Sequence, residues 1–265
     1  MKNERAYIGR IQHFNVHDGN GFRTTVFFQG CGMMCKWCQN PELQSNMPVQ
    51  VFDGEGGFED SSYLLDVEEI VTECEKESFF YRFHSGGVTL SGGEPLIHGE
   101  FVASLLERLV QEGINTAVET AGYVPWKNIE LVAPYVDTFM WDVKLISKDL
   151  RKKWLGVDAT LDLNNLKRVS KLHSKIVIRI PLIPGVNTGE EFERIVDFID
   201  KLHGISYVHI LPFHQFGSLK YEKINKEYTM TGFPLLSKEV IEHCKQRLEE
   251  HGYNVDVGGT GFTYL

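Results

Sequence analysis

The sequence predicts an α/β fold, an open partial (β/α)6 barrel in which six parallel strands alternate with helices. Short runs rich in β-branched and aromatic residues alternate with amphipathic helical patterns, which is typical of repeated βα units. We count six such runs, too few for a closed eight-stranded barrel. A doubly wound sheet is the alternative. Because no linker separates two halves, we expect a single domain over residues 1–265.

The expected strands are short and apolar: Thr24–Phe28, Val88–Leu90, Thr116–Glu119, Thr138–Val143, Ile176–Ile180 and Val208–Leu211. Asp66 with Glu69 predicts a capping box at a helix start. Thr188 with Glu191 predicts a second one, for a helix that stops at Gly204. Two further helices each end at a glycine, and we expect them over Phe101–Glu112 and Ser237–His251.

Three segments lack these patterns. Gln44–Ser62 is rich in glycine and is expected to form an exposed loop. Gly217–Phe233 is polar and irregular, which favours a mobile flap. The glycine-rich run Gly258–Gly261 is expected to be flexible, and the sequence indicates no function for it.

Composition excludes several classes of function. The chain has 265 residues, of which 42% are hydrophobic and 24% charged, as in ordinary globular proteins. Its 27 basic and 36 acidic residues give a net charge of −9, which argues against a nucleic-acid partner. The sequence has no apolar leader and no run long enough for a membrane span. We therefore expect reduced cysteines and a cytoplasmic location.

Three of the five cysteines lie within eight residues, with C-x3-C-x2-C spacing: Cys31, Cys35 and Cys38. A [4Fe–4S] cluster needs four ligands, so three thiolates would leave one iron open to a substrate or cofactor. A zinc site usually has a second ligand pair downstream, and none follows here; the upstream His13 and His17 would leave one cysteine unused. A disulfide needs an even set and an oxidising compartment. The other two cysteines are read as core residues: Cys74 and Cys244.

Polar groups also follow the later strands, at the edge where ligands bind in parallel α/β folds. The run Ser91–Pro95 contains two glycines that permit close backbone approach, although a plain strand-to-helix turn would use them too. Glu119–Gly122 and the pair Asp142 and Lys144 suit a polar ligand, a monovalent cation or both. The alternative for each is a solvated ion pair.

Two further candidates depend on this context. Arg179 interrupts an apolar strand, so it needs a partner such as Glu119 or a ligand carboxylate. His214 follows the last expected strand, where a lone histidine is more often a structural residue.

Together these residues resemble the radical S-adenosylmethionine (SAM) superfamily, specifically the activating enzymes of glycyl radical enzymes. The cysteine motif with Gly92-Gly93-Glu94 is typical of the superfamily. The motifs D-G-x-G-x-R, from Asp18 to Arg23, and D-x-K narrow the resemblance to the activating enzymes, over nearly the whole chain. Two positions depart from the pattern, since the family's usual proline and aspartate are replaced by Asn20 and Glu119.

The resemblance implies that the three cysteines bind three irons of one [4Fe–4S] cluster and that SAM chelates the fourth. Because residues 39–66 contain no cysteine, no further cluster is implied. The implied SAM contacts are Trp37, Gly92, Gly93, Glu94, Lys144, Arg179 and His214. The implied ligands of a monovalent cation are Glu119, Thr120, the Met140 carbonyl and Asp142. Asp18 matches the position that meets the substrate glycine loop.

The resemblance also implies the activity. The reduced cluster would cleave SAM, and the resulting 5′-deoxyadenosyl radical would take hydrogen from a glycine of a partner glycyl radical enzyme. Flavodoxin or ferredoxin is the expected electron donor. The alternatives are a radical SAM enzyme that acts on a small molecule, and a non-enzymatic metal-binding or electron-transfer protein. The sequence does not indicate which glycyl radical enzyme is the partner.

Overall fold

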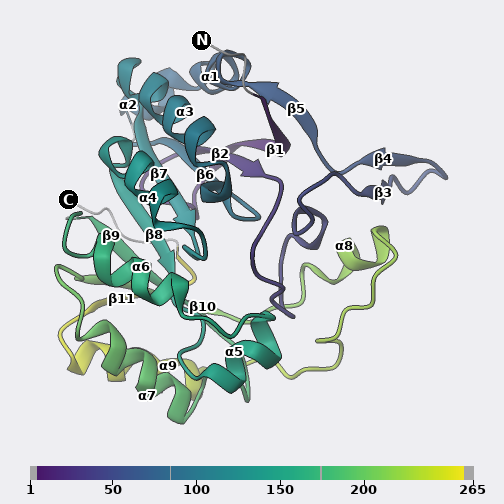
Figure 1. The fold of residues 1–265 in the computed structure, drawn as a ribbon. Helices are drawn as coiled ribbons and strands as arrows, with labels where there is room; N and C mark the ends of the chain where they lie inside the picture. The colour runs from purple at the N-terminus through teal and green to yellow at the C-terminus, as the bar shows by residue number, and fades with distance from the viewer. Residues whose placement is uncertain (1–4, 84, 174, 260–265) are drawn as a thin grey trace.

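The computed structural model describes residues 5–83, 85–173 and 175–259. A mostly parallel, nine-stranded sheet has the order β11-β10-β9-β8-β7-β6-β2-β1-β5 (Figure 1). The six predicted strands are confirmed, each within two residues of its expected bounds: β2 (Arg23–Phe28), β6 (Gly87–Gly92), β7 (Asn115–Thr120), β8 (Thr138–Asp142), β9 (Ile176–Leu182) and β10 (Tyr207–Pro212).

The sequence analysis missed strands at both edges of this sheet. β1 (Arg5–Asn15) pairs antiparallel with β2 and with β5 (Tyr63–Asp66), while β11 (Asn254–Val257) extends the parallel part beyond β10. The expected exposed loop, Gln44–Ser62, is partly wrong, because it contains an antiparallel hairpin that stands away from the body of the molecule (Figure 1). Its strands are β3 (Gln50–Phe52) and β4 (Phe58–Asp60).

Three helices confirm the predicted helix positions: α1 (Val67–Glu75), α3 (Gly99–Gln111) and α9 (Lys238–Glu250). The capping box at α1 is present, since the Glu69 N–H donates to Asp66 at 3.0 Å and the Asp66 N–H donates to Glu69 at 2.8 Å. The remaining helices are α2 (Ser78–Phe83), α4 (Trp126–Val132), α5 (Lys148–Leu155), α6 (Leu161–Val169), α7 (Glu190–Ile199) and α8 (Ser218–Lys223). Short 3-10 turns are η1 (Pro41–Leu43), η2 (Pro95–His98) and η3 (Ala133–Tyr135).

The predicted second capping box is wrong. The N-cap of α7 is Gly189, and no side chain caps the helix there. Glu191 instead accepts hydrogen bonds from the backbone N–H groups of Ile146 and Ser147, the latter at 2.8 Å. Its carboxylate therefore fixes the loop between β8 and α5. The helix also ends at Ile199, before the expected stop at Gly204.

The segment Gly217–Phe233 was expected to be irregular, and this is wrong for its first part, which forms α8. Tyr221 and Met230 are buried, and the Lys220 ammonium donates to the Gln39 carbonyl at 2.9 Å. The segment therefore packs against the residues that follow the cysteine loop. Of the glycine-rich run near the carboxyl end, Gly258 and Gly259 are described and residues 260–261 lie outside the described part.

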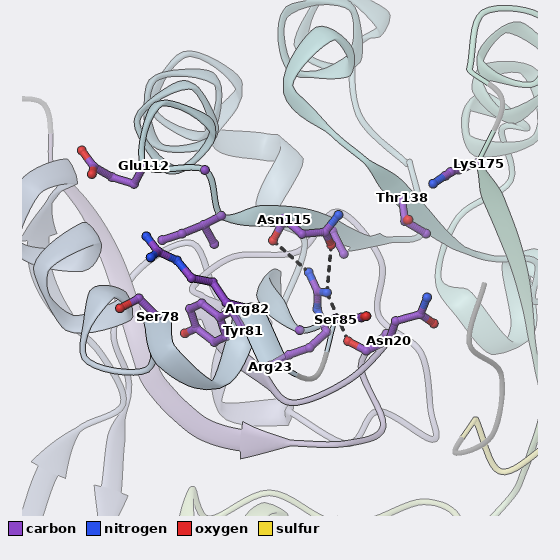
Figure 2. Close-up of a pocket in the computed structure, with 15 residues that line it drawn as sticks. Asn20, Arg23, Ser78, Tyr81, Arg82, Ser85, Glu112, Asn115, Thr138 and Lys175 are labelled. Atoms are coloured by element: carbon purple, nitrogen blue, oxygen red, sulfur yellow. Dashed lines mark hydrogen bonds between the residues drawn. The ribbon is translucent and has the colours of Figure 1, made fainter. Parts of the chain in front are cut away.

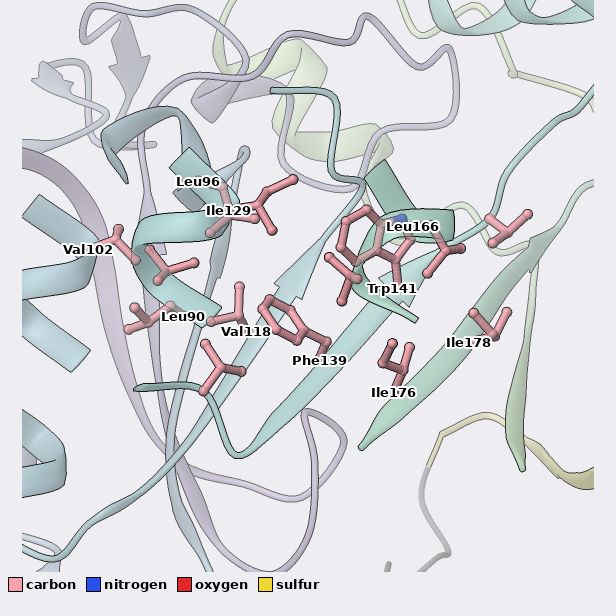
Figure 3. Packing of buried hydrophobic residues seen from close by; sticks show 14 of the residues in the cluster. Leu90, Leu96, Val102, Val118, Ile129, Phe139, Trp141, Leu166, Ile176 and Ile178 are labelled. Carbon is pink, nitrogen blue, oxygen red and sulfur yellow. The ribbon is translucent and has the colours of Figure 1, made fainter. Parts of the chain in front are cut away.

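The main hydrophobic core lies between the sheet and its covering helices (Figure 3). Strand residues such as Val118 and Phe139 pack against Ile129 and Leu166 from α4 and α6. The predicted core cysteines are confirmed, since both are buried in this cluster: Cys74 and Cys244. A second cluster, which includes Met33, Leu145 and Phe213, forms beneath the cysteine loop. Among the described helices, none is both long and apolar enough to span a membrane.

Candidate functional site

The cysteine loop follows β2 directly and lies at the carboxyl ends of the parallel strands. Its backbone is tied to the last turn of α5, because Met34 N–H donates to the Leu155 carbonyl at 2.8 Å and Lys36 N–H to the Trp154 carbonyl at 3.0 Å. On its other side, Gly30 N–H donates to Leu43 of η1 at 2.8 Å. The loop is therefore held in shape by contacts outside itself.

The three loop cysteines are free and half-buried: Cys31, Cys35 and Cys38. The Met33 N–H donates to the Cys31 sulfur and the Asn40 N–H donates to the Cys38 sulfur, each at 3.4 Å. Such N–H···S contacts are among the features that tune bound iron–sulfur clusters. Burial raises the pKa of the Cys35 thiol to about 12, so metal binding there must displace a proton.

The donor atoms of the cysteine loop are of the type that holds iron–sulfur clusters. No group of three or more histidine, cysteine or acidic side chains in residues 5–83, 85–173 and 175–259 is placed to hold one ion. A zinc site needs its ligands on a common metal, whereas in a [4Fe–4S] cube each thiolate binds a different iron. The donor set therefore fits a cube that lacks one protein ligand.

A row of polar side chains crosses the inner face of the sheet, and we call Ser91, Glu119, Arg179, Asp142 and Lys144 the polar row. Ser91 donates to Glu119 at 2.9 Å, and Glu119 lies 2.6 Å from the Arg179 guanidinium. The guanidinium Nε is 3.5 Å from Asp142, which also pairs with Lys144. The predicted pairing of Arg179 with Glu119 is therefore confirmed, and the row spans β6 to β9 and the residues that follow β8.

The charges of this row are strongly coupled. Burial lowers the pKa of Lys144, but the Asp142 carboxylate and the Cys35 sulfur outweigh that effect and raise it overall. Arg179 behaves in the same way beside Glu119 and Asp142, while burial raises the pKa of Glu119 in spite of Arg179. Both cations therefore stay charged at neutral pH.

The polar row retains unused hydrogen-bonding capacity. Arg179 Nε and Nη1 and Asp142 Oδ1 are buried, yet they have no hydrogen-bond partner in good geometry among the described residues. Their ion pairs are close in distance and poorly aligned in angle. Buried polar atoms are normally satisfied, so this arrangement suits a ligand that brings carboxylate and amino groups.

The glycine pair after β6 joins this site to the cysteine loop. Gly92 has a φ of +113°, and a Cβ atom there would lie 2.3 Å from the Phe28 backbone. A Cβ at Gly93 would lie 2.1 Å from the Gly30 carbonyl oxygen, and the next residue, Glu94, donates its N–H to that oxygen at 2.7 Å. Both glycines are thus required by the packing of the two loops as well as by any ligand.

Glu94 was expected to contact a cofactor, but its carboxylate is fully used inside the protein. The Thr120 hydroxyl and the Leu96 N–H donate to one oxygen at 2.6 and 3.2 Å. The N–H groups of Ala121 and Gly122 donate to the other at 2.9 and 3.1 Å. The side chain is only 1% exposed, and burial raises its pKa. Glu94 therefore positions the loop that follows β7.

We expect Glu94→Gln to lower the free energy of unfolding by about 2–3 kcal/mol. Glutamine replaces one acceptor oxygen with a donor, so backbone N–H groups of the loop after β7 lose their acceptor. Urea denaturation measures the loss, and Glu75→Gln on the exposed face of α1 is the matched control. An equal, small change in both variants would mean that Glu94 does not hold this loop.

The other predicted site residues occupy different environments. Trp37 is 6% exposed and packs in the second cluster, with its ring centroid 6.3 Å from that of Trp154. Met140 is fully buried on β8, where its side chain contacts other apolar residues. His214 lies beside the cysteine loop, because its carbonyl accepts from Gln39 at 3.4 Å, and burial lowers its pKa.

Asp18 lies on the segment between β1 and β2, at the amino end of the parallel strands. Its carboxylate accepts hydrogen bonds from Asn15 at 2.6 Å and from Thr25 at 2.9 Å. Its charge raises the pKa values of both Glu119 and Arg179, although burial and closer charges act on them more strongly. Asp18 is therefore within electrostatic range of the polar row.

The sequence analysis missed several residues that position this site. The Asn165 amide donates to the carbonyls of Gly122 and Val124 at 2.9 and 2.8 Å, and Asn187 donates to the Lys144 carbonyl at 3.1 Å. Both asparagines are buried, Asn165 on α6 and Asn187 in the loop after β9, and no local sequence pattern indicates either role. His209, on β10, is also buried near Arg179.

The buried His209 is expected to make the free energy of unfolding depend on pH. Burial lowers its pKa from 6.5 to about 4, Asp256 opposes this effect and Arg179 adds to it. The folded state therefore binds fewer protons than the unfolded state, so stability falls as pH drops from 6.5 toward 4, by on the order of 3 kcal/mol. Guanidinium denaturation across this range checks the slope. His209→Asn should flatten it, whereas His243→Asn on the exposed face of α9 should not.

Comparison with known proteins places this geometry in a family. The radical SAM superfamily model matches residues 25–199. The chain is 33% identical to a trans-4-hydroxy-L-proline dehydratase activating enzyme of Clostridioides difficile, covering 94% of this chain and 98% of that protein. It is 32% identical to a pyruvate formate-lyase 2-activating enzyme of Escherichia coli (strain K12), covering 97% and 94%.

Solved structures agree. A domain of a pyruvate-formate lyase-activating enzyme from Bacteroides vulgatus ATCC 8482 superposes with a TM-score of 0.54 at 30% identity, covering 65% of this chain and 98% of that one. QueE from Escherichia coli gives 0.58 at 12% identity over 96% of this chain and 93% of that one, which supports the fold alone. The chain therefore belongs to the radical SAM superfamily and, within it, to the activating enzymes of glycyl radical enzymes, which work with a [4Fe–4S] cluster and SAM.

Proposed function

We propose that the chain holds its cluster on Cys31, Cys35 and Cys38 and binds SAM against the polar row, in order to place a radical on a glycine of a partner enzyme. The observation that carries this assignment is the position of Lys144. Its ammonium pairs with Asp142 and lies within electrostatic range of Cys35, so the polar row extends toward the cysteine loop. Buried cations beside an open metal corner suit an amino acid ligand.

When bound and reduced, the cluster would supply the electron for reductive cleavage of SAM, and the resulting 5′-deoxyadenosyl group would take the glycine α-hydrogen. The chain's own residues bind and orient. We assign Lys144 and Arg179 to the SAM carboxylate, the backbone of Gly92 and Gly93 to its amino group, and His214 to its ribose. Trp37, which packs in the hydrophobic cluster beneath the cysteine loop, is assigned to contact with the adenine. Glu94 acts as a positioning residue.

The monovalent cation belongs to the same proposal. Glu119 and Asp142 are now neutralised by Arg179 and Lys144. We expect a cation to join Glu119, Asp142, Thr120 and the Met140 carbonyl only when SAM draws the two side-chain cations to its own carboxylate. Potassium should therefore tighten SAM binding, which isothermal titration of the reconstituted protein would measure.

The partners of the proposed reaction are two proteins. One is a glycyl radical enzyme whose glycine loop meets Asp18, and the other is a flavodoxin or ferredoxin that delivers the electron. We place the reaction in the cytoplasm, where the cluster thiols stay reduced before assembly.

The test is anaerobic incubation of reconstituted protein with SAM, a reductant and a panel of glycyl radical enzymes. The panel holds trans-4-hydroxy-L-proline dehydratase, pyruvate formate-lyase 2 and the glycyl radical enzyme encoded nearest to this chain's gene. We expect 5′-deoxyadenosine in the solution and a glycyl EPR signal on one panel member. SAM cleavage with no signal on any partner would instead indicate a small-molecule substrate.

A further inference from the structure

A continuous group of phenylalanines lies on the surface at the amino ends of the parallel strands, and we call Phe14, Phe22, Phe79, Phe80 and Phe83 the aromatic patch. The rings form a chain from Phe22 to Phe14, Phe80, Phe79 and Phe83, with centroid separations of 6.4, 5.1, 5.7 and 4.6 Å. Phe14, Phe79 and Phe83 are 50%, 64% and 68% exposed. Large exposed apolar patches usually mark interaction sites.

The patch rests on a helix whose two faces differ. On α2, the patch residues Phe79 and Phe83 face solvent, while Ser78, Tyr81 and Arg82 line a groove of about 280 Å³ (Figure 2). The opposite wall of the groove comes from the segment that contains Asn20 and Arg23, and Arg23 is fixed by bonds to Asn115. The patch and the groove therefore share the helix α2.

The backbone conformation of Phe14 also indicates that the exposed patch has a function. Phe14 has a φ of +55°, a left-handed conformation that bulky side chains rarely adopt. Such strain persists where the surrounding structure imposes it, and it is concentrated at functional positions. Here it directs an aromatic ring into the patch, where Phe22 and Phe80 contact it.

The patch adjoins the segment between β1 and β2. Phe14 and Phe22 bracket the segment that carries Asp18, whose carbonyl accepts from Thr89 on the inner face of the sheet at 2.6 Å. The Asp18 charge in turn acts on Glu119 and Arg179 of the polar row. A protein bound on the patch would thus lie next to Asp18, at the amino end of the barrel.

We propose that the aromatic patch is the docking surface for the folded body of the partner glycyl radical enzyme, distinct from the contacts made by its glycine loop. The proposal rests on the proposed function, because it assigns this surface to the protein substrate of that reaction. The surface is mainly apolar, so the matching region of the partner is expected to be apolar.

The test separates binding of the partner's body from the chemistry. The double variant Phe79→Gln/Phe83→Gln removes two exposed rings from the patch. Its matched control is Phe52→Gln/Phe58→Gln, which removes the exposed ring pair of the β3–β4 hairpin, 5.7 Å apart. Each variant is assayed with the whole partner that the wild type activates, with a short peptide of that partner's glycine loop, and with SAM alone.

We expect the patch variant to raise the KM for the whole partner at least about tenfold, because aromatic anchors dominate interface energetics. Its KM for the peptide and its cleavage of SAM alone should stay within about twofold of wild type, and the control variant should match wild type throughout. An unchanged KM for the whole partner would overturn the proposal. So would a change from dimer to monomer in sedimentation with unchanged partner kinetics, since the occupant would then be a second copy.

The same experiments distinguish failure of the docking surface from failure of the proposed function. A wild-type chain that cleaves SAM but activates no panel member would count against the proposed function. A wild-type chain that activates a partner, together with a patch variant that does so equally well, would reject the docking surface alone.

Discussion

Replacing Cys31, Cys35 or Cys38 with alanine is expected to abolish cluster retention and SAM cleavage, while the same change at Cys74 or Cys244 should leave both near wild type. All five thiols are free in the structure. Only the first three lie on the loop beside Lys144, whereas the last two are buried among apolar side chains of the main core. A cube already short of one protein ligand has no spare thiolate, so a single loss leaves two.

Cys74 and Cys244 serve as matched controls for the three loop cysteines. Cys74→Ala and Cys244→Ala remove a buried sulfur and create a small cavity, so a loss of about 1 kcal/mol in stability is expected without loss of iron. Iron and sulfide content after anaerobic reconstitution, followed by 5′-deoxyadenosine production, measures both properties. A full cube in any of the three loop variants would show that another group ligates the iron and would contradict the site.

Much of this site follows from local sequence and one topological rule. The strands of the sheet are short β-rich runs, and the carboxyl ends of parallel strands meet at one edge. Residues at the ends of separate strands, such as Glu119 and Asp142, could therefore be expected together, and Arg179 within an apolar strand needed a partner. The family motifs added the roles that these residue types alone leave open.

The features that sequence reasoning missed depend on partners distant in the chain. Glu94 was read as a ligand contact because its motif lies at the strand end, yet its acceptors are filled by the loop after β7. Glu191 matched a capping pattern but bonds to Ser147, more than forty residues away. Tertiary packing decides which donor a carboxylate bonds to, and local sequence propensity does not indicate that donor.

The aromatic residues of α2 illustrate the same limit. A run of phenylalanines ordinarily predicts burial, but this short helix turns Ser78 and Tyr81 toward the groove and leaves Phe79 and Phe83 exposed. The sequence shows the aromatic residues and not the face they occupy. The exposure of Phe79 and Phe83 is therefore known only from the structure, and it supports the docking surface proposed above.

The largest structural effect is expected at Arg151, which holds the corner between α5 and α6. The guanidinium is 0% exposed and donates to the two Asp162 oxygens at 3.0 and 2.6 Å, and to the Leu145 and Ala159 carbonyls at 2.8 and 2.7 Å. Removing one partner of a buried pair leaves the other uncompensated. Arg151→Ala is therefore expected to lower the free energy of unfolding by about 3–5 kcal/mol.

The Arg151→Ala variant is also expected to retain less iron, because the last turn of α5 supplies the carbonyls of Trp154 and Leu155 that anchor the cysteine loop. Denaturation and iron content are measured on the same samples. The double variant Arg151→Met/Asp162→Leu replaces the pair with apolar groups and should recover most of both, whereas the exposed Arg194→Ala should change stability by less than about 0.5 kcal/mol. A single variant that loses stability but keeps its iron would show that the cysteine loop does not depend on this corner for its shape.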